Sequence, residues 1–244
     1  MSTSSTSSID TPGNDTSTGV SNDGDRPSTS SLDLGVIGNC SYSALIDKLG
    51  RIVWCCLPRF DGDPVFNALL DPGESGSLWS FELENFSHSE QWYEPNTAVL
   101  KTRLYDTLGQ GVEITDFAPR FPSRGRFFRP QTLVRRVLPL NGAPRLRVLL
   151  RPRFDWGREL PKITRGSNHV RYVGAEMTLR LNTDAPISYL LDETAFVVSR
   201  PFNFLLGPDE TLTGGIGDTA RRSLYASSFS HGSVAHFTRY STGV

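Results

Sequence analysis

Residues 34–71 read LGVIGNCSYSALIDKLGRIVWCCLPRFDGDPVFNALLD, and this stretch decides the fold. Its first half predicts a β-hairpin over residues 42–56, because apolar runs flank Gly50, which can supply the positive φ of a tight turn. Trp54 lies in a run too apolar for an exposed strand, so we expect it in the core. After a loop rich in proline, glycine and aspartate, residues 65–70 have the composition of one or two helical turns.

Outward from this hairpin, the sequence shows short strands and no long helical periodicity. Asn141-Gly142, between two apolar runs, is a strong turn signal. Further strands are expected at residues 79–83, 98–105, 112–117, 131–139, 145–151, 170–182, 187–192, 195–199 and 203–206. Many short strands at near-regular spacing predict an all-β fold, a large antiparallel two-sheet sandwich (a supersandwich).

Composition divides the 244 residues into three parts. Serine and threonine supply 16 of the first 31 residues, so residues 1–33 are expected to be a disordered arm that cannot bury enough apolar surface to order itself. Residues 34–212 carry the predicted sandwich. Residues 213–244 begin with the linker-like Gly214-Gly215-Ile216-Gly217, and we assign no element to the rest.

Charge and cysteine content exclude several classes of protein. The net charge is −1, and the three cysteines, Cys40, Cys55 and Cys56, are odd in number with two adjacent. This argues against a disulfide framework, and no histidine stands at zinc-ligand spacing, so we expect free thiols in the core and neither a metal nor a cofactor. No apolar run reaches the about 20 residues of a membrane span. Without a signal peptide, a cytoplasmic setting with no membrane partner is expected.

Residues 101–165 are basic, with thirteen arginines and two lysines against five acids. A nucleic-acid partner is not expected, because few aromatic residues stand between the basic ones for base stacking. Most of these arginines are expected on outer faces, in ion pairs or in a surface against which a further domain docks. The arginines in question are Arg135, Arg136, Arg145, Arg147, Arg151 and Arg153.

The order of several short motifs resembles the trehalase-like N-terminal domain of glycoside hydrolase family 15, in its branch of bacterial-type glucoamylases and trehalases. The likeness covers about residues 34–218. The motifs are Ile37-Gly38-Asn39, residues 44–47, residues 50–54, Leu57-Pro58-Arg59-Phe60-Asp61 with Asp63, Asp116-Phe117, residues 151–157 and residues 206–210.

That family implies a β-sandwich followed by an α/α barrel, which carries two catalytic glutamates as general acid and general base. No segment of this chain fits such a barrel, so we expect no catalytic residue here. The resemblance implies the accessory domain of a glycosidase that acts, through its barrel, on an α-glucan or a trehalose-like sugar. Two alternatives stay open: a stand-alone carbohydrate-binding β-sandwich, and the inactive product of a truncated gene.

The candidate substrate-binding residues are Arg59, Phe60, Asp61 and Asp63. Carboxylates accept hydrogen bonds from sugar hydroxyls, and an aromatic ring offers a stacking face. The structural alternative is a loop held by Asx-turns and an arginine–aspartate pair. We expect the loop at one end of the sandwich, where a barrel would dock. A general acid and base within this loop is excluded, because two carboxylates two residues apart share one environment.

Overall fold

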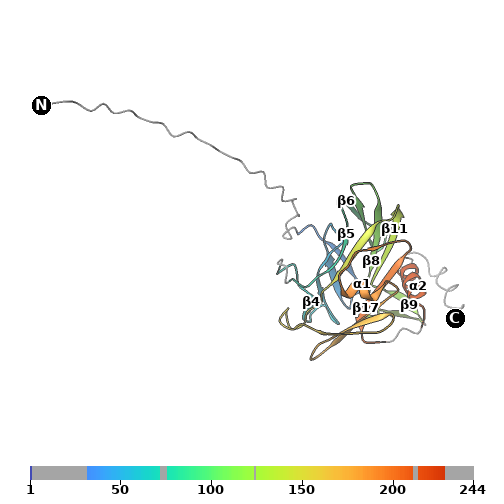
Figure 1. Cartoon of the computed structure of the whole chain (residues 1–244). Helices are drawn as coiled ribbons and strands as arrows, with labels where there is room; N and C mark the ends of the chain where they lie inside the picture. The colour runs from blue at the N-terminus through green and yellow to red at the C-terminus, as the bar shows by residue number, and fades with distance from the viewer. Residues whose placement is uncertain (2–31, 72–75, 124, 211–213, 229–244) are drawn as a thin grey trace.

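The protein is represented by a computed structural model that describes residues 1, 32–71, 76–123, 125–210 and 214–228. These residues form two antiparallel sheets that pack face to face, which confirms the predicted all-β sandwich (Figure 1). Most of the expected N-terminal arm and the last sixteen residues lie outside the described part of the chain.

The first sheet has seven strands and contains the predicted hairpin. Gly50 has φ 71° in the turn, as expected. The strand order is β1-β2-β3-β5-β12-β16, with β4 beside β3. The strands are β1 (Gly35–Gly38), β2 (Ser43–Ile46), β3 (Ile52–Cys56), β4 (Pro64–Phe66), β5 (Trp79–Leu83), β12 (Arg145–Leu150) and β16 (Phe196–Val197).

The second sheet has eight strands in the order β13-β14-β15-β17-β11-β8-β7-β6. A separate two-stranded ribbon is formed by β9 (Phe121–Ser123) and β10 (Arg126–Phe128). The strands of the second sheet are β13 (Lys162–Arg165), β14 (His169–Val173), β15 (Thr178–Thr183), β17 (Phe202–Pro208), β11 (Leu133–Asn141), β8 (Gly111–Phe117), β7 (Leu100–Asp106) and β6 (Phe86–Tyr93).

The main core lies between the two sheets. Trp79 and Phe81 of β5 meet Phe204 of β17, with ring centroids 6.4 Å and 5.2 Å from that of Phe204. All three side chains are almost completely buried. Rings from facing strands thus fill the space between the sheets, as side chains of the two inner faces do in sandwiches.

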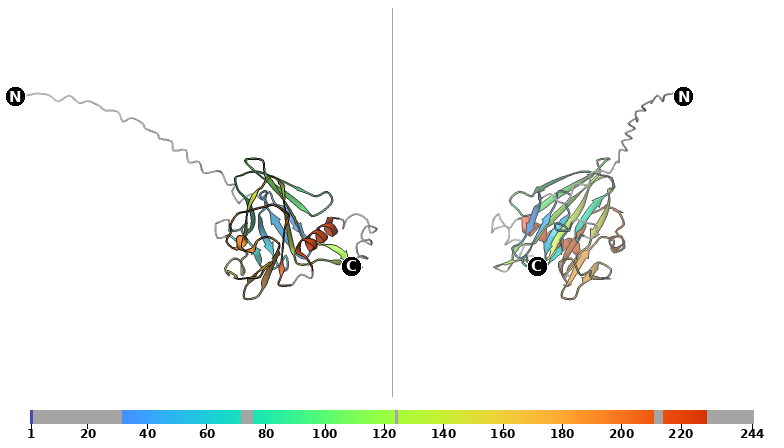
Figure 2. Two further views of the ribbon diagram at one scale, coloured as in Figure 1. Left: turned by 45° about the vertical axis from the view of Figure 1, so that its right-hand side comes forward. Right: turned by 90° about the vertical axis from the view of Figure 1, so that its left-hand side faces the viewer.

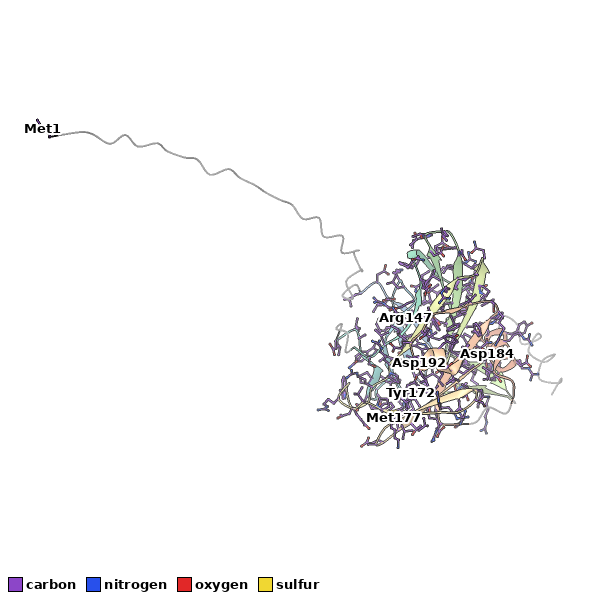
Figure 3. The ribbon with its side chains drawn as sticks, viewed as in Figure 1. Met1, Arg147, Tyr172, Met177, Asp184 and Asp192 are labelled. Carbon is purple, nitrogen blue, oxygen red and sulfur yellow. The ribbon has the colours of Figure 1, made fainter. Side chains whose placement is uncertain are left out.

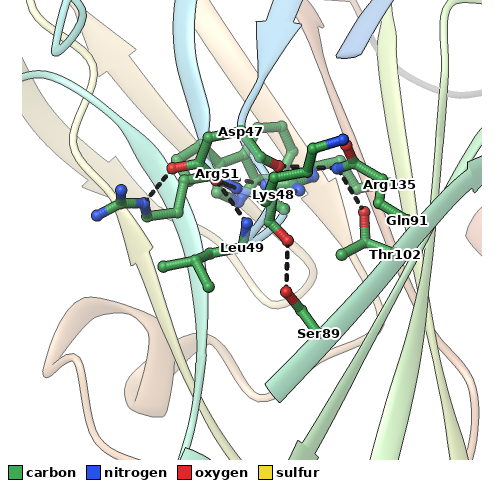
Figure 4. A network of polar contacts seen from close by, with 10 residues as sticks. Asp47, Lys48, Leu49, Arg51, Ser89, Gln91, Thr102 and Arg135 are labelled. Carbon is green, nitrogen blue, oxygen red and sulfur yellow. Dashed lines mark hydrogen bonds and ion pairs between the residues drawn. The ribbon is translucent and has the colours of Figure 1, made fainter. Parts of the chain in front are cut away.

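The turn of the β2–β3 hairpin joins the two sheets by polar contacts (Figure 4). The Asp47 carboxylate accepts bonds from the backbone N–H groups of Leu49 and Arg51 and from the Arg51 side chain. Its backbone carbonyl accepts from the Gln91 amide, which comes from the second sheet. Aspartate therefore both shapes the turn and anchors it across the sandwich.

Arg135 departs from the sequence prediction, because it is fully buried and does not lie on an outer face. In β11, Arg135 lies two residues from both Leu133 and Val137, so the three side chains point to the same face of the sheet. Leu133 and Val137 belong to the core, and the Arg135 side chain therefore enters the core too. It donates to both carboxylate oxygens of Asp116 at 2.8 and 3.0 Å. The other arginines behave as predicted where they meet acids, in the exposed pairs Arg145–Glu84, Arg147–Glu82 and Arg151–Glu193.

Two short segments fold differently from the prediction. Residues 187–192 were expected to be a strand, but α1 (Ile187–Leu191) is a short helix that begins after Pro186 and buries Leu190. Residues 65–70 were expected to be helical, but the first of them belong to β4 and a turn follows. Short apolar runs fit either structure, and the neighbouring strand decides between them.

Helix α2 (Ile216–Ser228) occupies the stretch to which the sequence assigned no element. Ile216, Ala220 and Leu224, spaced four residues apart, pack on the outer face of the eight-stranded sheet against Val134 and Leu205. Figure 2 shows α2, in red, lying against the sheet. Helical spacing of three apolar residues was present in the sequence, but small polar residues between them obscured it.

Two further expectations for single residues are wrong. Trp54 is only partly buried, since Cys55 beside it belongs to the core and Trp54 therefore points to the outer face of the seven-stranded sheet. Cys55 and Cys56 are buried free thiols as expected, but Cys40 is exposed.

Candidate functional site

The predicted loop joins β3 to β4 at one end of the sandwich. The Phe60 N–H donates to the Ser41 carbonyl at 3.2 Å, and the Gly62 N–H donates to the Arg59 carbonyl at 3.1 Å. Next to Ser41, the Cys40 sulfur accepts a bond from the Arg120 guanidinium. The loop therefore lies beside the segment that leads into the β9–β10 ribbon, and β4 and β9 both lie in the lower part of Figure 1.

Arg59 and Asp61 are paired with each other. The guanidinium donates two hydrogen bonds, of 2.8 and 2.7 Å, to the two carboxylate oxygens. These bonds raise the pKa of Arg59 and lower the pKa of Asp61. Both side chains are exposed, and the Phe60 ring between them is 66% exposed. The pair has the geometry of the structural alternative, yet it also presents a charged and aromatic tip to solvent.

Asp63, the fourth predicted residue, belongs to a different surface. It lines an open pocket of about 410 Å³ together with Phe154, Asp155, Glu159 and Glu176. Met177 lines the same pocket and is labelled in the lower part of Figure 3. Asp63 is exposed. The pKa of the Cys56 thiol is raised mainly by the burial of that thiol and secondly by the negative charge of Asp63. Three separate segments thus bring carboxylates to this pocket.

A second motif of the sequence analysis, residues 151–157, lies directly beside this loop. The Arg153 N–H donates to the carbonyl of Val65, within β4, at 3.1 Å. The indole of Trp156 rests on that of Trp54, with ring centroids 6.4 Å apart and planes tilted by 58°. Trp156 is 53% exposed. Trp156 belongs to the motif at residues 151–157 but is not among the predicted substrate-binding residues. A tryptophan in a motif that follows a strand is a signal for a binding surface.

The backbone that carries Trp156 is strained. Asp155, Trp156 and Gly157 have φ values of 48°, 55° and 88°, all in the left-handed region that bulky side chains avoid. The bend is closed by paired backbone bonds of 3.0 Å between Phe154 and Glu159. Such strain persists only where the surroundings hold it. The bend therefore holds the backbone of Trp156 in one conformation and leaves its ring accessible to solvent.

The described residues show neither a metal centre nor a membrane span. Within residues 32–71, 76–123, 125–210 and 214–228, no three of histidine, cysteine, aspartate and glutamate cluster as metal ligands would. In the same part of the chain, neither helix has the length and apolar character to span a bilayer. The exposed groups of this end of the sandwich include aromatic rings, carboxylates and the paired guanidinium groups of Arg59 and Arg158, a set suited to binding polar ligands.

Comparison with known proteins was made on the whole sequence. The family model "Trehalase-like, N-terminal" matches residues 27–194. Trehalase 1 of Sulfolobus acidocaldarius is 30% identical over 158 residues, which are 63% of this chain and 25% of that protein. Trehalase of Thermoplasma volcanium is 25% identical over 155 residues, 63% of this chain and 24% of that protein.

A trehalase of Mycolicibacterium smegmatis is 28% identical over 142 residues, 52% of this chain and 20% of that protein. The match thus spans about a quarter or less of each of these relatives. No solved structure matches the chain significantly. Because the family model covers well over half of the sequence, and because the strands and the two motifs form one sandwich, the chain belongs to the trehalase-like N-terminal family.

Proposed function

We propose that this chain is the accessory domain of a trehalase-like glycosidase and has no hydrolytic activity by itself. In the whole enzyme, an α/α barrel of the family 15 kind would supply the general acid and general base that cleave an α-glucosidic bond. The sandwich would support the barrel and place its loop near the mouth of the active site. The family match, together with the meeting of two motifs at one end of the sandwich, carries this proposal.

The position of α2 supports a barrel at the end of the sandwich that holds the loop. The Arg120 N–H donates to the hydroxyl of Ser227, near the end of α2, while the Arg120 side chain lies over the Phe127 ring and contacts Cys40. A domain that follows α2 would therefore start beside the ribbon. The ribbon carries Phe127 and Phe128, which are 53% and 55% exposed. Exposed aromatic rings of this kind are typical of surfaces that dock a partner.

We propose Arg59, Phe60, Asp61 and Asp63 as the residues that this domain contributes toward the sugar or toward a barrel loop. Loops held by a rigid scaffold are where binding residues concentrate. The Arg59–Asp61 pair keeps the tip in one shape, which lowers the entropy lost on binding.

A chimera tests the proposed function. Residues 32–228 of this chain would replace the matching quarter of Trehalase 1 from Sulfolobus acidocaldarius, and the same protein without that quarter would serve as the control. The chimera is expected to hydrolyse trehalose and the shortened control to be inactive. The chain alone is expected to release no glucose from trehalose, maltose or starch. Release by the pure chain above a heat-killed sample would overturn the non-catalytic role.

The loop is tested in the same chimera with Asp61→Asn. If the loop serves the site, kcat/KM for trehalose falls at least about tenfold, which corresponds to about 1.4 kcal/mol. If the melting temperature falls while kcat and KM stay unchanged, the pair with Arg59 only stabilises the turn, and the assignment of this loop to the substrate is wrong.

A further inference from the structure

Trp156 combines exposure with a fixed position. Trp156 is 53% exposed, and its ring contacts that of Trp54 at a tilt of 58°. Trp54 pairs across the sheet with Leu45, on the face opposite the core. Tryptophan offers the largest flat apolar area of any side chain, and an indole left open on a fixed bend is a ready contact surface.

The bend has little freedom to retract the ring. The Arg153 guanidinium donates to the Gly157 carbonyl, and Arg158 forms an ion pair with Asp155 at 2.7 Å. A Cβ atom at Gly157 would lie 2.6 Å from the amide nitrogen of Asn67, so the bend packs closely against the residue that follows β4. A contact residue held in this way loses little conformational entropy when it binds a ligand.

Hydrogen-bond acceptors line the pocket that the bend borders through Phe154, Asp155 and Glu159. Asp155 is the chain neighbour of Trp156, and Asp63 lines the same pocket as Asp155. No residue in the described part of the chain donates a hydrogen bond to the Asp63 carboxylate, while Asp155 is held by Arg158. A carboxylate that is exposed and unengaged accepts bonds from hydroxyl donors.

We infer that Trp156, on Trp54, and Asp63 form a carbohydrate-binding site of this chain itself, for the glucopyranose ring of an α-glucoside. The C–H face of the sugar packs on the Trp156 indole, and ring hydroxyls donate to Asp63. The class of sugar rests on the proposed function, whereas the site rests on the geometry of the bend. Binding here needs no barrel, so the site would hold a glucoside close to the enzyme independently of its cleavage.

Calorimetric titration of the whole chain with trehalose and with maltotriose tests the site, with glycerol as a polyol that lacks a ring. Saturable binding of at least one sugar, and none of glycerol, is expected. Trp156→Ala should weaken binding at least about tenfold, as truncation of a central aromatic contact does. Asp63→Ala should weaken it at least about tenfold, the effect of one lost hydrogen bond to a charged group.

Phe86→Ala is the control, because Phe86 is also an exposed aromatic side chain but lies on β6 of the eight-stranded sheet. This variant should bind as the wild type does. Trp156→Phe keeps a smaller ring and should retain part of the affinity, which separates loss of contact from loss of fold. Absence of sugar binding by the folded wild type would overturn the site. Unchanged affinity in Trp156→Ala together with a lower melting temperature would also overturn it, because the Trp156 ring would then only cover Trp54. An inactive chimera beside intact sugar binding would reject the proposed function and leave this site standing.

Discussion

Replacing Arg135 by methionine should be the most damaging single change in the sandwich that leaves side-chain volume nearly unchanged. The guanidinium is fully buried and donates to both oxygens of Asp116. It also donates to the backbone carbonyls of Trp79, at 2.9 Å, and of Gly50. Since Asp116 and Arg135 come from one sheet and the two carbonyls from the other, this side chain joins the sheets by hydrogen bonds inside the core.

The loss of stability follows from the unpaired carboxylate that the variant leaves in the core. Methionine fills most of the space, but the Asp116 carboxylate stays completely buried without its two charged bonds. Breaking a buried ion pair on one side costs about 3–5 kcal/mol. Domains unfold at about 5–15 kcal/mol, so Arg135→Met should lose about a fifth or more of the free energy of unfolding. For a chain of this size, the melting temperature should fall by about 6–20 °C.

Urea unfolding followed by tryptophan fluorescence measures this loss, with a constant m-value as the check on two-state behaviour. The double variant Arg135→Met with Asp116→Leu should recover most of it, because no charge is left unpaired. A loss below about 1 kcal/mol in the single variant would refute the reasoning, since it would mean that water reaches Asp116.

The pH dependence of the same variant gives a second check. Burial already raises the pKa of Asp116, and Arg135 opposes that rise. Without Arg135 the folded-state pKa should rise further above the unfolded value of about 3.9. A raised pKa contributes stability below the unfolded pKa, and this is lost as pH rises through the folded pKa. The difference in free energy of unfolding between the wild type and Arg135→Met should therefore shrink as the pH is lowered from 7 toward 4. A difference that does not change with pH would contradict this.

Three other predictions concern residues at different depths. In urea unfolding, Trp54→Ala should lower the free energy of unfolding by about 1–2 kcal/mol and Trp79→Ala by about 3–5 kcal/mol, because only Trp79 is a core ring. Equal losses would be inconsistent with the observed burial. In the native protein an aromatic disulfide reagent should modify Cys40 rapidly and the two thiols of β3 only after unfolding, because burial raises the pKa of both. A hydrogen bond from Arg171 lowers the pKa of Asp209, so this carboxylate contributes stability above its unfolded pKa that is lost as pH falls through its folded pKa. In unfolding assays, wild type and Asp209→Asn should differ slightly at pH 7 and converge once the pH falls below the folded-state pKa.

Local features of the chain were enough to predict the class of fold and the two motifs. Apolar runs of strand length and the glycine of the first hairpin are local features, and they predicted the sandwich and its hairpin correctly. The order of short motifs pointed to the family before any comparison. These signals are readable because strand alternation and turn chemistry depend on residues close together in the chain.

The faces that those residues occupy depend on how the strands pack in three dimensions. Arg135 enters the core because the register of β11 points its side chain inward, and Trp54 faces outward because its neighbour fills the core instead. The meeting of Trp54 with Trp156, about a hundred residues apart, depends on how β4 aligns with the segment after β12. Pairings of this kind arise from packing across the whole sandwich, and a one-residue change of register would reverse them, so local periodicity cannot determine them.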